Sequence, residues 1–408
     1  MSRLLLILLA LTVSACATLS PERERAGAAD RPLVILVGID GFRADYLERG
    51  VTPTLSALRA DGAFAAMRPS FPSVTFPNHY TLVTGLHPDR HGIVNNTMMD
   101  AELGRFSLGN AAAVTNGDWW DEGEPIWVTA ERAGLTTGTM FWPGSEAGIG
   151  GVRPSHWTVF DQALPGDARV DRVLEWLDLP GDERPDFATL YFDIVDTAGH
   201  HHGPAAPETT EAIASVDASI ARLIAGLEAR GLAGRTTLVI VADHGMAPTS
   251  PDRAVYLDDL IDLETVDVVH AGAFAGLNPA PGREAEVQAA LVRRHANMEC
   301  YNKADLPARL AYGRHPRVPA ILCLPDTGWL VATRAWPVRG PGGAHGYDNM
   351  APEMAALFIA SGPGIRSGVV LQDMDAVDVQ PLLAHLLGIE APQGDGSIED
   401  TAPALVRP

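Results

Sequence analysis

The stretch LVILVGI at positions 33–39, followed directly by Asp40, decides the fold class. A continuous apolar run of this length, rich in β-branched residues, is typical of a strand that is covered on both faces. Runs of the same kind recur later in the chain, at 136–141, 187–195, 237–242 and 355–360. Between them lie segments that predict helices, at 52–58, 125–133, 170–177, 211–230 and 375–387. This alternation predicts an α/β fold with a doubly wound, mostly parallel sheet and helices on both faces.

One part of the chain, from about residue 253 to 340, breaks this alternation. It is rich in proline and glycine, and its predicted elements are strands at 266–274, 321–324 and 329–332 and a helix at 283–295. Residues that suit metal binding resume after it, so we expect a small inserted α+β subdomain rather than a separate linked domain. The domain that contains this insert is expected to span residues 33–408.

The first residues have the pattern of an export signal. Arg3 is followed by an almost purely apolar run and by small residues, which predicts a signal peptide over residues 1–15. The run is too short to span a bilayer. Cys16 after small residues resembles a bacterial lipobox and predicts a lipid-modified N-terminus with a tether over 16–32; an ordinary signal peptide with an incidental cysteine is the alternative. Ala17, in place of an aspartate, favours a lipoprotein on the outer membrane that faces the periplasm.

Composition limits the ligands and the redox state. The 408 residues include 51 acidic and 30 basic side chains, for a formal net charge of −21. This balance argues against a surface that coats nucleic acid, and a bound phosphate ester would need positive charge from another source, such as metal ions. Apart from Cys16, the chain has only Cys300 and Cys323. In an oxidising compartment such a pair favours one disulfide over two buried free thiols.

Acidic and histidine side chains follow the predicted strands, where an open α/β sheet binds its ligands. They are Asp40 after the first strand, Asp196 and His200 after the third, Asp243 and His244 after the fourth, and His345 in a later glycine-rich loop. Each alone has an ordinary explanation, as a helix cap or a hydrogen-bonded histidine. Together, three carboxylates and three imidazoles suit two zinc ions, whose positive charge exceeds the negative charge of the carboxylates.

A hydroxyl group lies in a further segment, PSVTFPNH at 72–79. Pro77 can begin a helix, which would place Thr75 just before the helix N-terminus, where the backbone favours an anion. A hydroxyl beside two metal ions predicts phosphoryl transfer, because the ions can activate a nucleophile and stabilise a leaving oxygen. His79, in the same segment, is expected to be structural.

These motifs resemble the nucleotide pyrophosphatase/phosphodiesterase family of the alkaline phosphatase superfamily. The resemblance covers about residues 33 to 387. It rests on GIDGFR at 38–43, PSVTFPNH at 72–79, TGLHP at 84–88, HGIVNN at 91–96, FWPGS at 141–145, DTAGH at 196–200, ADHGM at 242–246 and GAHGY at 343–347. The combination implies a fold of the alkaline-phosphatase type and a site that holds two zinc ions.

The resemblance also implies a metal role for each matching residue. One zinc would be held by Asp40, Thr75, Asp243 and His244. The other would be held by Asp196, His200 and His345. Thr75 would in addition be the nucleophile.

The substrate positions follow from the same resemblance. Asn96 would donate its amide to a phosphate oxygen, together with the backbone N–H of Phe76. Phe76, Trp157 and Tyr191 match aromatic positions that line the family's nucleobase slot. Many relatives have tyrosine where this chain has Trp157, so the shape of the slot is expected to differ.

The implied activity is hydrolysis of nucleotide phosphodiesters and pyrophosphates to nucleoside 5′-monophosphates through a covalent phosphothreonine. The alternative within the family is a phospholipid-type phosphodiesterase that releases choline or glycerol head groups. A non-catalytic lipoprotein that uses the fold as a binding surface is the alternative from a different class. The expected partner is a small phosphodiester, and membrane contact is expected only through the lipid on Cys16.

Overall fold

The computed structural model describes residues 31–406. The predicted signal peptide and the lipid attachment site at Cys16 lie outside the described residues. From Pro32 onward the described chain forms one compact unit. Within residues 31–406, no helix combines the length and the apolar character needed to cross a bilayer.

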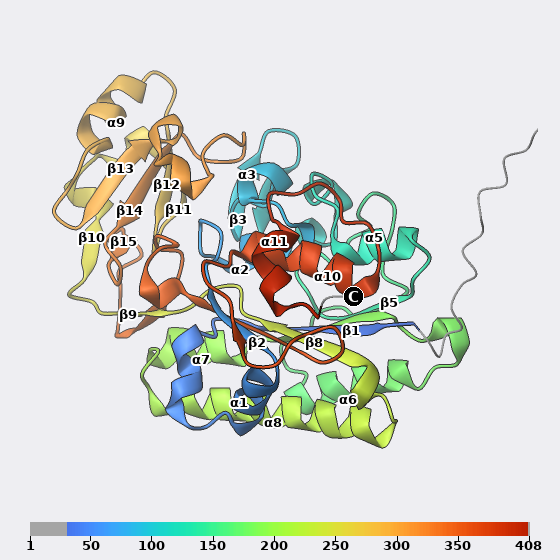
Figure 1. The fold of residues 1–408 in the computed structure, drawn as a ribbon. Coiled ribbons are helices and arrows are strands. Elements are labelled where there is room, and N and C mark those ends of the chain that lie inside the picture. Colours follow the sequence, from blue (N-terminus) through green and yellow to red (C-terminus); the bar gives the residue numbers. More distant parts are fainter. Residues whose placement is uncertain (1–30, 407–408) are drawn as a thin grey trace, which may run out of the picture. The chain divides into compact units, whose positions relative to one another are not determined.

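A mixed eight-stranded sheet lies at the centre of this unit (Figure 1). From one edge to the other its strands are β18 (Val369–Val370), β2 (Ala63–Met67), β17 (Ala356–Ser361), β8 (Thr236–Val241), β1 (Leu33–Ile39), β7 (Phe187–Phe192), β5 (Thr137–Met140) and β6 (His156–Trp157). β1 is parallel to both of its neighbours, β8 and β7, and every residue of these three strands is buried. The strand expected from the opening apolar run therefore lies in the middle of the sheet.

Three strands differ from what the sequence suggests. β17 runs antiparallel to both β8 and β2, whereas β18 pairs with β2 in parallel, so β17 is the strand that interrupts the parallel pairings. β2 was not expected, because its sequence, AFAAM, is short and consists mostly of small residues. The strand predicted over 187–195 ends at Phe192, since the chain turns into helix at Ile194.

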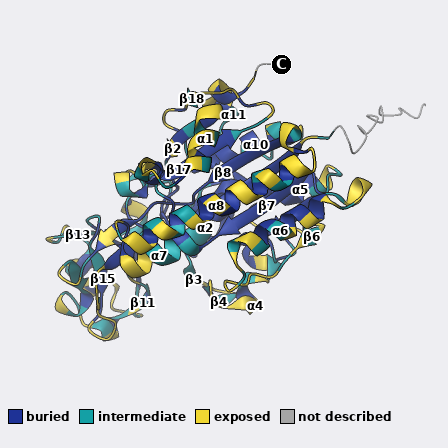
Figure 2. Cartoon of the chain, turned by 90° about the horizontal axis from the view of Figure 1, so that it is seen from below, coloured by how far each residue is buried: buried dark blue, intermediate teal, exposed yellow. Residues whose placement is uncertain are grey.

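Helices cover both faces of the sheet, as expected (Figure 1). On one face lie α1 (Pro53–Asp61), α6 (Gly166–Leu177) and α8 (Pro207–Ala229), and on the other lie α2 (Thr75–Thr84), α5 (Ile126–Arg132) and α10 (Val379–Leu387). Figure 2 shows the strands buried and the outer sides of α6 and α8 exposed, which is the pattern of amphipathic helices packed on a core. The predicted doubly wound α/β fold is confirmed.

The segment expected as an insert builds a second, four-stranded sheet with its own core. In sheet order the strands are β11 (Val266–His270), β12 (Ala275–Pro279), β14 (Ile321–Pro325) and β13 (Met298–Asn302). All their pairings are antiparallel, and α9 (Glu284–Leu291) contributes Val287 and Leu291 to the core. The strand predicted over 266–274 therefore ends earlier, at His270, and the chain turns back to form β12 from Ala275 onward.

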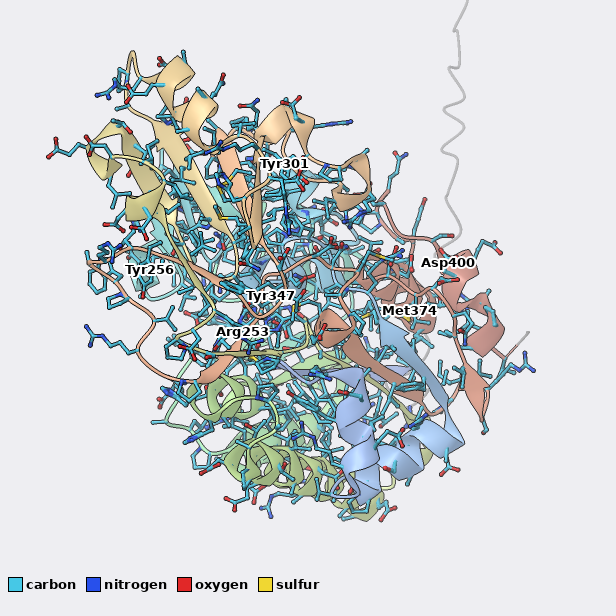
Figure 3. All side chains as sticks on the ribbon, turned by 90° about the vertical axis from the view of Figure 1, so that its left-hand side faces the viewer. Arg253, Tyr256, Tyr301, Tyr347, Met374 and Asp400 are labelled. Atoms are coloured by element: carbon cyan, nitrogen blue, oxygen red, sulfur yellow. A yellow bond between two sulfur atoms is a disulfide. The ribbon has the colours of Figure 1, made fainter. Side chains whose placement is uncertain are left out.

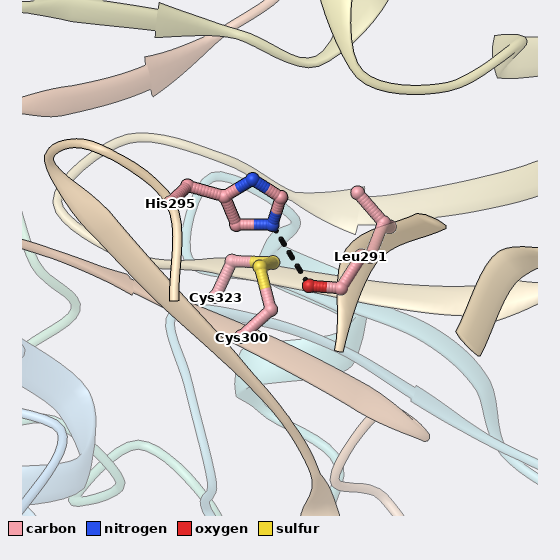
Figure 4. The surroundings of a disulfide bond; sticks show 4 residues. All are labelled: Leu291, His295, Cys300 and Cys323. Atoms are coloured by element: carbon pink, nitrogen blue, oxygen red, sulfur yellow. Dashed lines mark hydrogen bonds between the residues drawn. A yellow bond between two sulfur atoms is a disulfide. The ribbon is translucent and has the colours of Figure 1, made fainter. Parts of the chain in front are cut away.

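A disulfide joins Cys300 in β13 to Cys323 in β14, which confirms the predicted pairing (Figure 4). The two cysteines occupy directly opposed positions of the antiparallel pair, and both are buried. Beside the disulfide, His295 donates a ring N–H to the carbonyl oxygen of Leu291 at 2.9 Å. The bond ties together the two strands that form one edge of the second sheet.

Shorter elements complete the chain. They are α3 (Pro88–His91), β3 (Thr97–Asp100), β4 (Gly104–Ser107), α4 (Ala111–Val114), α7 (Ile194–His202), β9 (Ala247–Thr249), β10 (Ala254–Tyr256), β15 (Leu330–Ala332), β16 (Gly342–Ala344) and α11 (Ile398–Thr401). Two of them, α7 and β16, matter for the site. α7 follows β7, and β16 pairs with β9, which is the next strand after β8.

Candidate active site

The site is built at one edge of the central sheet, where three adjacent parallel strands end. Asp40 follows β1, and Asp243 follows β8 after one residue. α7, which starts two residues after β7, carries Asp196 and His200 one turn apart. Because neighbouring parallel strands end on the same side, these side chains meet although their positions in the sequence are far apart.

His345 reaches the same edge from the loop after β16. That loop is held in place by Tyr347, whose buried ring packs in a small cluster with Ala247 and Met354 (Tyr347 is labelled in Figure 3). The imidazole of His345 lies flat against that of His244, with ring centroids 3.5 Å apart and an interplanar angle of 9°. The pair of rings connects the two groups of predicted metal residues.

The first group surrounds the predicted nucleophile. His244 Nε2 lies 2.9 Å from Asp243 Oδ2, 3.5 Å from Asp40 Oδ1 and 3.3 Å from the hydroxyl oxygen of Thr75. All the residues expected to share one zinc therefore lie together. Asp196, which is expected at the other zinc, also places a donor atom within 4.8 Å of Asp40 and His244, so the two groups adjoin.

The residues expected to hold the second zinc, Asp196, His200 and His345, also lie close together. His200 Nε2 lies 3.4 Å from Asp196 Oδ1 and 3.1 Å from His345 Nε2. The three residues offer donor atoms within 4.8 Å of one another. His201 and His202, which follow His200, are exposed and lie outside this group, so the i, i+4 spacing selects the histidine that faces Asp196.

The hydrogen bonds of the three histidines leave one nitrogen of each directed to the site. Nδ1 of His200, His244 and His345 each bonds a backbone carbonyl oxygen at 2.9 Å. A carbonyl can only accept, so Nδ1 carries the proton and Nε2 keeps its lone pair. Two such lone pairs face each other at 3.1 Å between His200 and His345, an arrangement that favours a cation between them.

The carboxylates fit metal ions for a similar reason. One buried oxygen of each, Asp40 Oδ1, Asp196 Oδ1 and Asp243 Oδ2, has no hydrogen-bond partner among the described residues. Buried polar atoms are normally satisfied, and these three atoms all point into the two groups. Oxygen and imidazole nitrogen donors of this kind suit zinc.

Charge repulsion makes the cluster costly without added positive charge. Burial, with the charges of Asp243 and Asp196, raises the pKa of Asp40 well above its usual value, and burial also raises the pKa of Asp196. Burial acts to raise the pKa of Asp243 too, but His244 and His79 hold it well below the usual value. Divalent cations would offset this repulsion, because they supply the charge that three buried carboxylates need.

Thr75 is the first residue of α2, not the residue before it. The helix begins earlier than Pro77 because the backbone N–H of Asn78 already donates to the carbonyl oxygen of Val74 at 3.1 Å. The hydroxyl of Thr75 therefore lies within the first turn, beside the unpaired N–H groups that favour an anion. The expected environment is retained although the predicted boundary was wrong by two residues.

The side chain of Asn96 accepts a hydrogen bond from the backbone N–H of Phe76, the group that was expected to bind phosphate. The backbone N–H of Phe76 donates to Asn96 Oδ1 at 2.9 Å, so it already has a partner in this structure, and its contact with a phosphate oxygen stays a prediction. The same bond fixes which end of the amide faces α2, since only the carbonyl oxygen can accept. The expected bond from the NH₂ group of Asn96 to a phosphate oxygen stays a prediction.

The three predicted aromatic residues have different surroundings. Phe76 is half-buried and packs edge-on against Phe106, with centroids 5.9 Å apart. Trp157, at the end of the edge strand β6, is 39% exposed, and the guanidinium of Arg153 lies 5.0 Å from its ring. Tyr191 is only 7% exposed, and its hydroxyl donates to Asp40 Oδ2 at 2.5 Å.

Two residues near the site escaped the sequence reasoning. His79, expected to be structural, lies 3.3 Å from Asp243 Oδ2 through Nδ1, which also contacts the carbonyl oxygen of Thr75 at 3.0 Å. Its i+4 position after Thr75 was the available signal. Phe160 is 42% exposed, and its ring lies 6.0 Å from that of Tyr191; an exposed aromatic in a loop carries no pattern that would reveal it.

The fold is an α/β fold of the alkaline-phosphatase type, and the site has the residues of a hydrolase. Comparisons with known proteins identify the family. A family model for type I phosphodiesterase/nucleotide pyrophosphatase matches residues 34–348. The chain therefore belongs to this family of phosphodiesterase and pyrophosphatase enzymes.

Similar proteins come from distant organisms. The chain is 38% identical over 387 residues to an uncharacterized pyrophosphatase/phosphodiesterase of Schizosaccharomyces pombe, covering 91% of this chain and 80% of that one. It is 37% identical over 388 residues to the bovine (Bos taurus) ectonucleotide pyrophosphatase/phosphodiesterase family member 3, covering 90% of this chain but 43% of that protein. The chain thus spans less than half the length of this animal relative.

Solved structures agree with the sequence comparison. Murine ectonucleotide pyrophosphatase/phosphodiesterase 5 superposes with a TM-score of 0.88 at 33% identity, over 92% of this chain and all of that one. An inactive threonine-to-alanine variant of the murine protein in complex with AMP matches equally well, with a TM-score of 0.88 at 32% identity over 92% of this chain and 100% of that one.

Proposed function

We propose that this chain hydrolyses nucleotide phosphodiesters and pyrophosphates to nucleoside 5′-monophosphates through a covalent phosphothreonine on Thr75, with two zinc ions. The observation that carries the proposal is the clustering of buried oxygens of three carboxylates with three imidazole Nε2 atoms, one of which, that of His244, lies 3.3 Å from that hydroxyl. The AMP complex of the murine relative supports a nucleotide substrate.

Seven residues of the chain would hold the two zinc ions. One zinc would be held by Asp40, Thr75, Asp243 and His244, and the other by Asp196, His200 and His345. When bound, the two ions would supply the positive charge that favours the Thr75 alkoxide and the departing oxygen. The backbone carbonyls bonded to the three Nδ1 atoms fix the histidine tautomers, so each ring is oriented before substrate arrives.

Thr75 would act as the nucleophile in two balanced steps. Its oxygen forms a bond to phosphorus as the bond to the leaving oxygen breaks, and the leaving group takes up a proton. Water then attacks the phosphothreonine, the Thr75 oxygen–phosphorus bond breaks, and the hydroxyl regains its proton. The NH₂ of Asn96 would donate to a phosphate oxygen that gains charge in both steps.

We further propose that aromatic side chains bind the nucleoside. Phe76 follows Thr75 directly, and Trp157 presents a partly exposed ring at the edge of the sheet. Stacking on such rings tolerates every base, because each base has a π-face.

A pair of assays tests the proposal. Release of p-nitrophenol from thymidine 5′-monophosphate p-nitrophenyl ester should be fast, and release of choline from a choline phospholipid should be slow. The reverse order would favour the phospholipid-type phosphodiesterase. Failure to turn over either substrate in the zinc-loaded protein would favour the binding lipoprotein.

We also infer export and lipid attachment at Cys16, on an outer membrane and facing the periplasm. The support is the sequence pattern of residues 1–16, together with the disulfide between Cys300 and Cys323, which suits an oxidising compartment. Cys16→Ser should release the protein from the membrane fraction of cells that express it, and continued membrane association would contradict the lipid anchor.

A further inference from the structure

Tyr191 lies where its hydroxyl meets a predicted metal residue instead of a substrate. It is in β7, directly opposite Gly38 of β1, two positions before Asp40. Its hydroxyl reaches across to donate to Asp40 Oδ2 at 2.5 Å. The ring is 7% exposed, and the ring of His79 lies edge-on to it at 5.1 Å.

Because of this hydrogen bond, the two carboxylate oxygens of Asp40 have different surroundings. Oδ2 accepts from Tyr191, whereas Oδ1 has no hydrogen-bond partner among the described residues and lies 3.5 Å from His244 Nε2. A carboxylate can rotate and exchange its oxygens, but a fixed donor on one of them selects a single orientation. Tyr191 therefore keeps the free oxygen of Asp40 turned toward the site.

Asp243 shows the same division, with a backbone donor in place of the tyrosine. Its Oδ1 accepts from the N–H of Gly41 at 3.1 Å, and its Oδ2 has no hydrogen-bond partner in the described part of the chain. Two adjacent carboxylates are thus each held by one oxygen, and each turns its other oxygen toward His244. For Asp243 the holding group belongs to the backbone, but for Asp40 it is a side chain that can be removed by substitution.

We propose that Tyr191 is a positioning residue for the cation site, which orients Asp40 through its phenol, and that it is not a wall of the nucleobase slot. The proposal rests on the proposed function, because it assumes that Asp40 binds a metal ion. A ring buried to this extent offers little face to a base, whereas its hydroxyl is fully committed to Asp40. Partners that orient a metal ligand in this way typically contribute 10- to 100-fold to metal affinity.

The test compares Tyr191→Phe with Tyr312→Phe as a matched control. Tyr312 is also buried, and its hydroxyl donates to the carbonyl oxygen of Val94 at 2.9 Å, with no predicted metal residue as partner. Zinc content is measured by atomic absorption while a chelator of known affinity competes for the metal. Tyr191→Phe should weaken the binding of zinc by roughly 10- to 100-fold, whereas Tyr312→Phe should leave it unchanged.

Substrate kinetics at saturating zinc separate the two roles of Tyr191. A positioning residue predicts that the KM of Tyr191→Phe for the thymidine ester stays near that of the unaltered protein. Unchanged zinc affinity would overturn the proposal, and so would an equal loss of affinity in both variants, which would indicate general loosening of the core. An unaltered protein that binds no zinc would instead refute the proposed function, so the two failures are distinguishable.

A double substitution keeps the proposal testable if Tyr191→Phe alone proves unstable. If Tyr191 acts only through Asp40, then Tyr191→Phe should cause no further loss of zinc affinity in an Asp40→Asn background. Losses that multiply independently would overturn the proposal.

Discussion

Asn96 provides the sharpest test of the site, because the oxygen of its amide has a partner in the structure and its NH₂ group is proposed to bind substrate. Its oxygen accepts from the Phe76 N–H at 2.9 Å, which leaves its NH₂ group to donate to substrate. Asn96→Ala removes both interactions. Asn96→Asp keeps an acceptor for Phe76 but replaces the donor by a second oxygen, so the pair separates the structural bond from the catalytic one.

The expected magnitudes follow from the two interactions. Loss of one preorganised donor to a developing oxyanion costs about 2.7–4 kcal/mol, or roughly 100- to 1,000-fold in kcat. Loss of the bond to Phe76 should lower the free energy of unfolding by about 1 kcal/mol. We therefore expect both variants to lose at least about 100-fold in kcat with the thymidine ester, and only Asn96→Ala to lose stability.

The assay combines steady-state kinetics at saturating zinc with urea unfolding of the same preparations. Asn96→Asp adds a negative charge beside a phosphate anion, so its kcat should fall at least as far as that of Asn96→Ala. A near-normal kcat for Asn96→Asp would refute the reasoning, because the NH₂ group would then contribute nothing to the reaction.

Three further predictions concern the nucleophile, the metals and the base. Thr75→Ala should remove almost all turnover while zinc content stays close to that of the unaltered protein, and Thr75→Ser should keep some activity because the hydroxyl survives; near-normal kcat in Thr75→Ala would mean that no phosphothreonine forms. Chelation should abolish turnover and added zinc should restore it, because three buried carboxylates need positive charge; active protein without a bound transition metal would contradict this. Phe76→Ala should raise KM for nucleotide diesters by roughly ten-fold, from one lost stacking contact of about 1–3 kcal/mol, but hardly affect bis-p-nitrophenyl phosphate. An equal loss on both substrates would show that the ring only packs against Phe106.

Several strands of the central sheet could be predicted from the sequence, because a buried strand is a short, continuous run of apolar residues. The apolar run at 33–39 became β1, in the middle of the sheet, and every residue in it is buried. The direction of β17 has no such signature, since a buried strand has the same composition in either orientation. The end of β11 at His270, inside the strand predicted over 266–274, was likewise hidden, because the position of a turn depends on what the strands on either side of it pack against.

The sequence by itself determined which residues could carry the chemistry, because metal ligands must be of particular types and because strand ends of a parallel sheet meet at one edge. Asp40, Asp243 and the Asp196–His200 pair follow from that rule alone. Only the tertiary structure decided the partners of individual atoms: the Phe76 N–H is taken by Asn96, and the Tyr191 hydroxyl by Asp40. Those bonds join residues 20 and 151 positions apart, and such contacts depend on how whole elements pack, which no local pattern of side chains encodes.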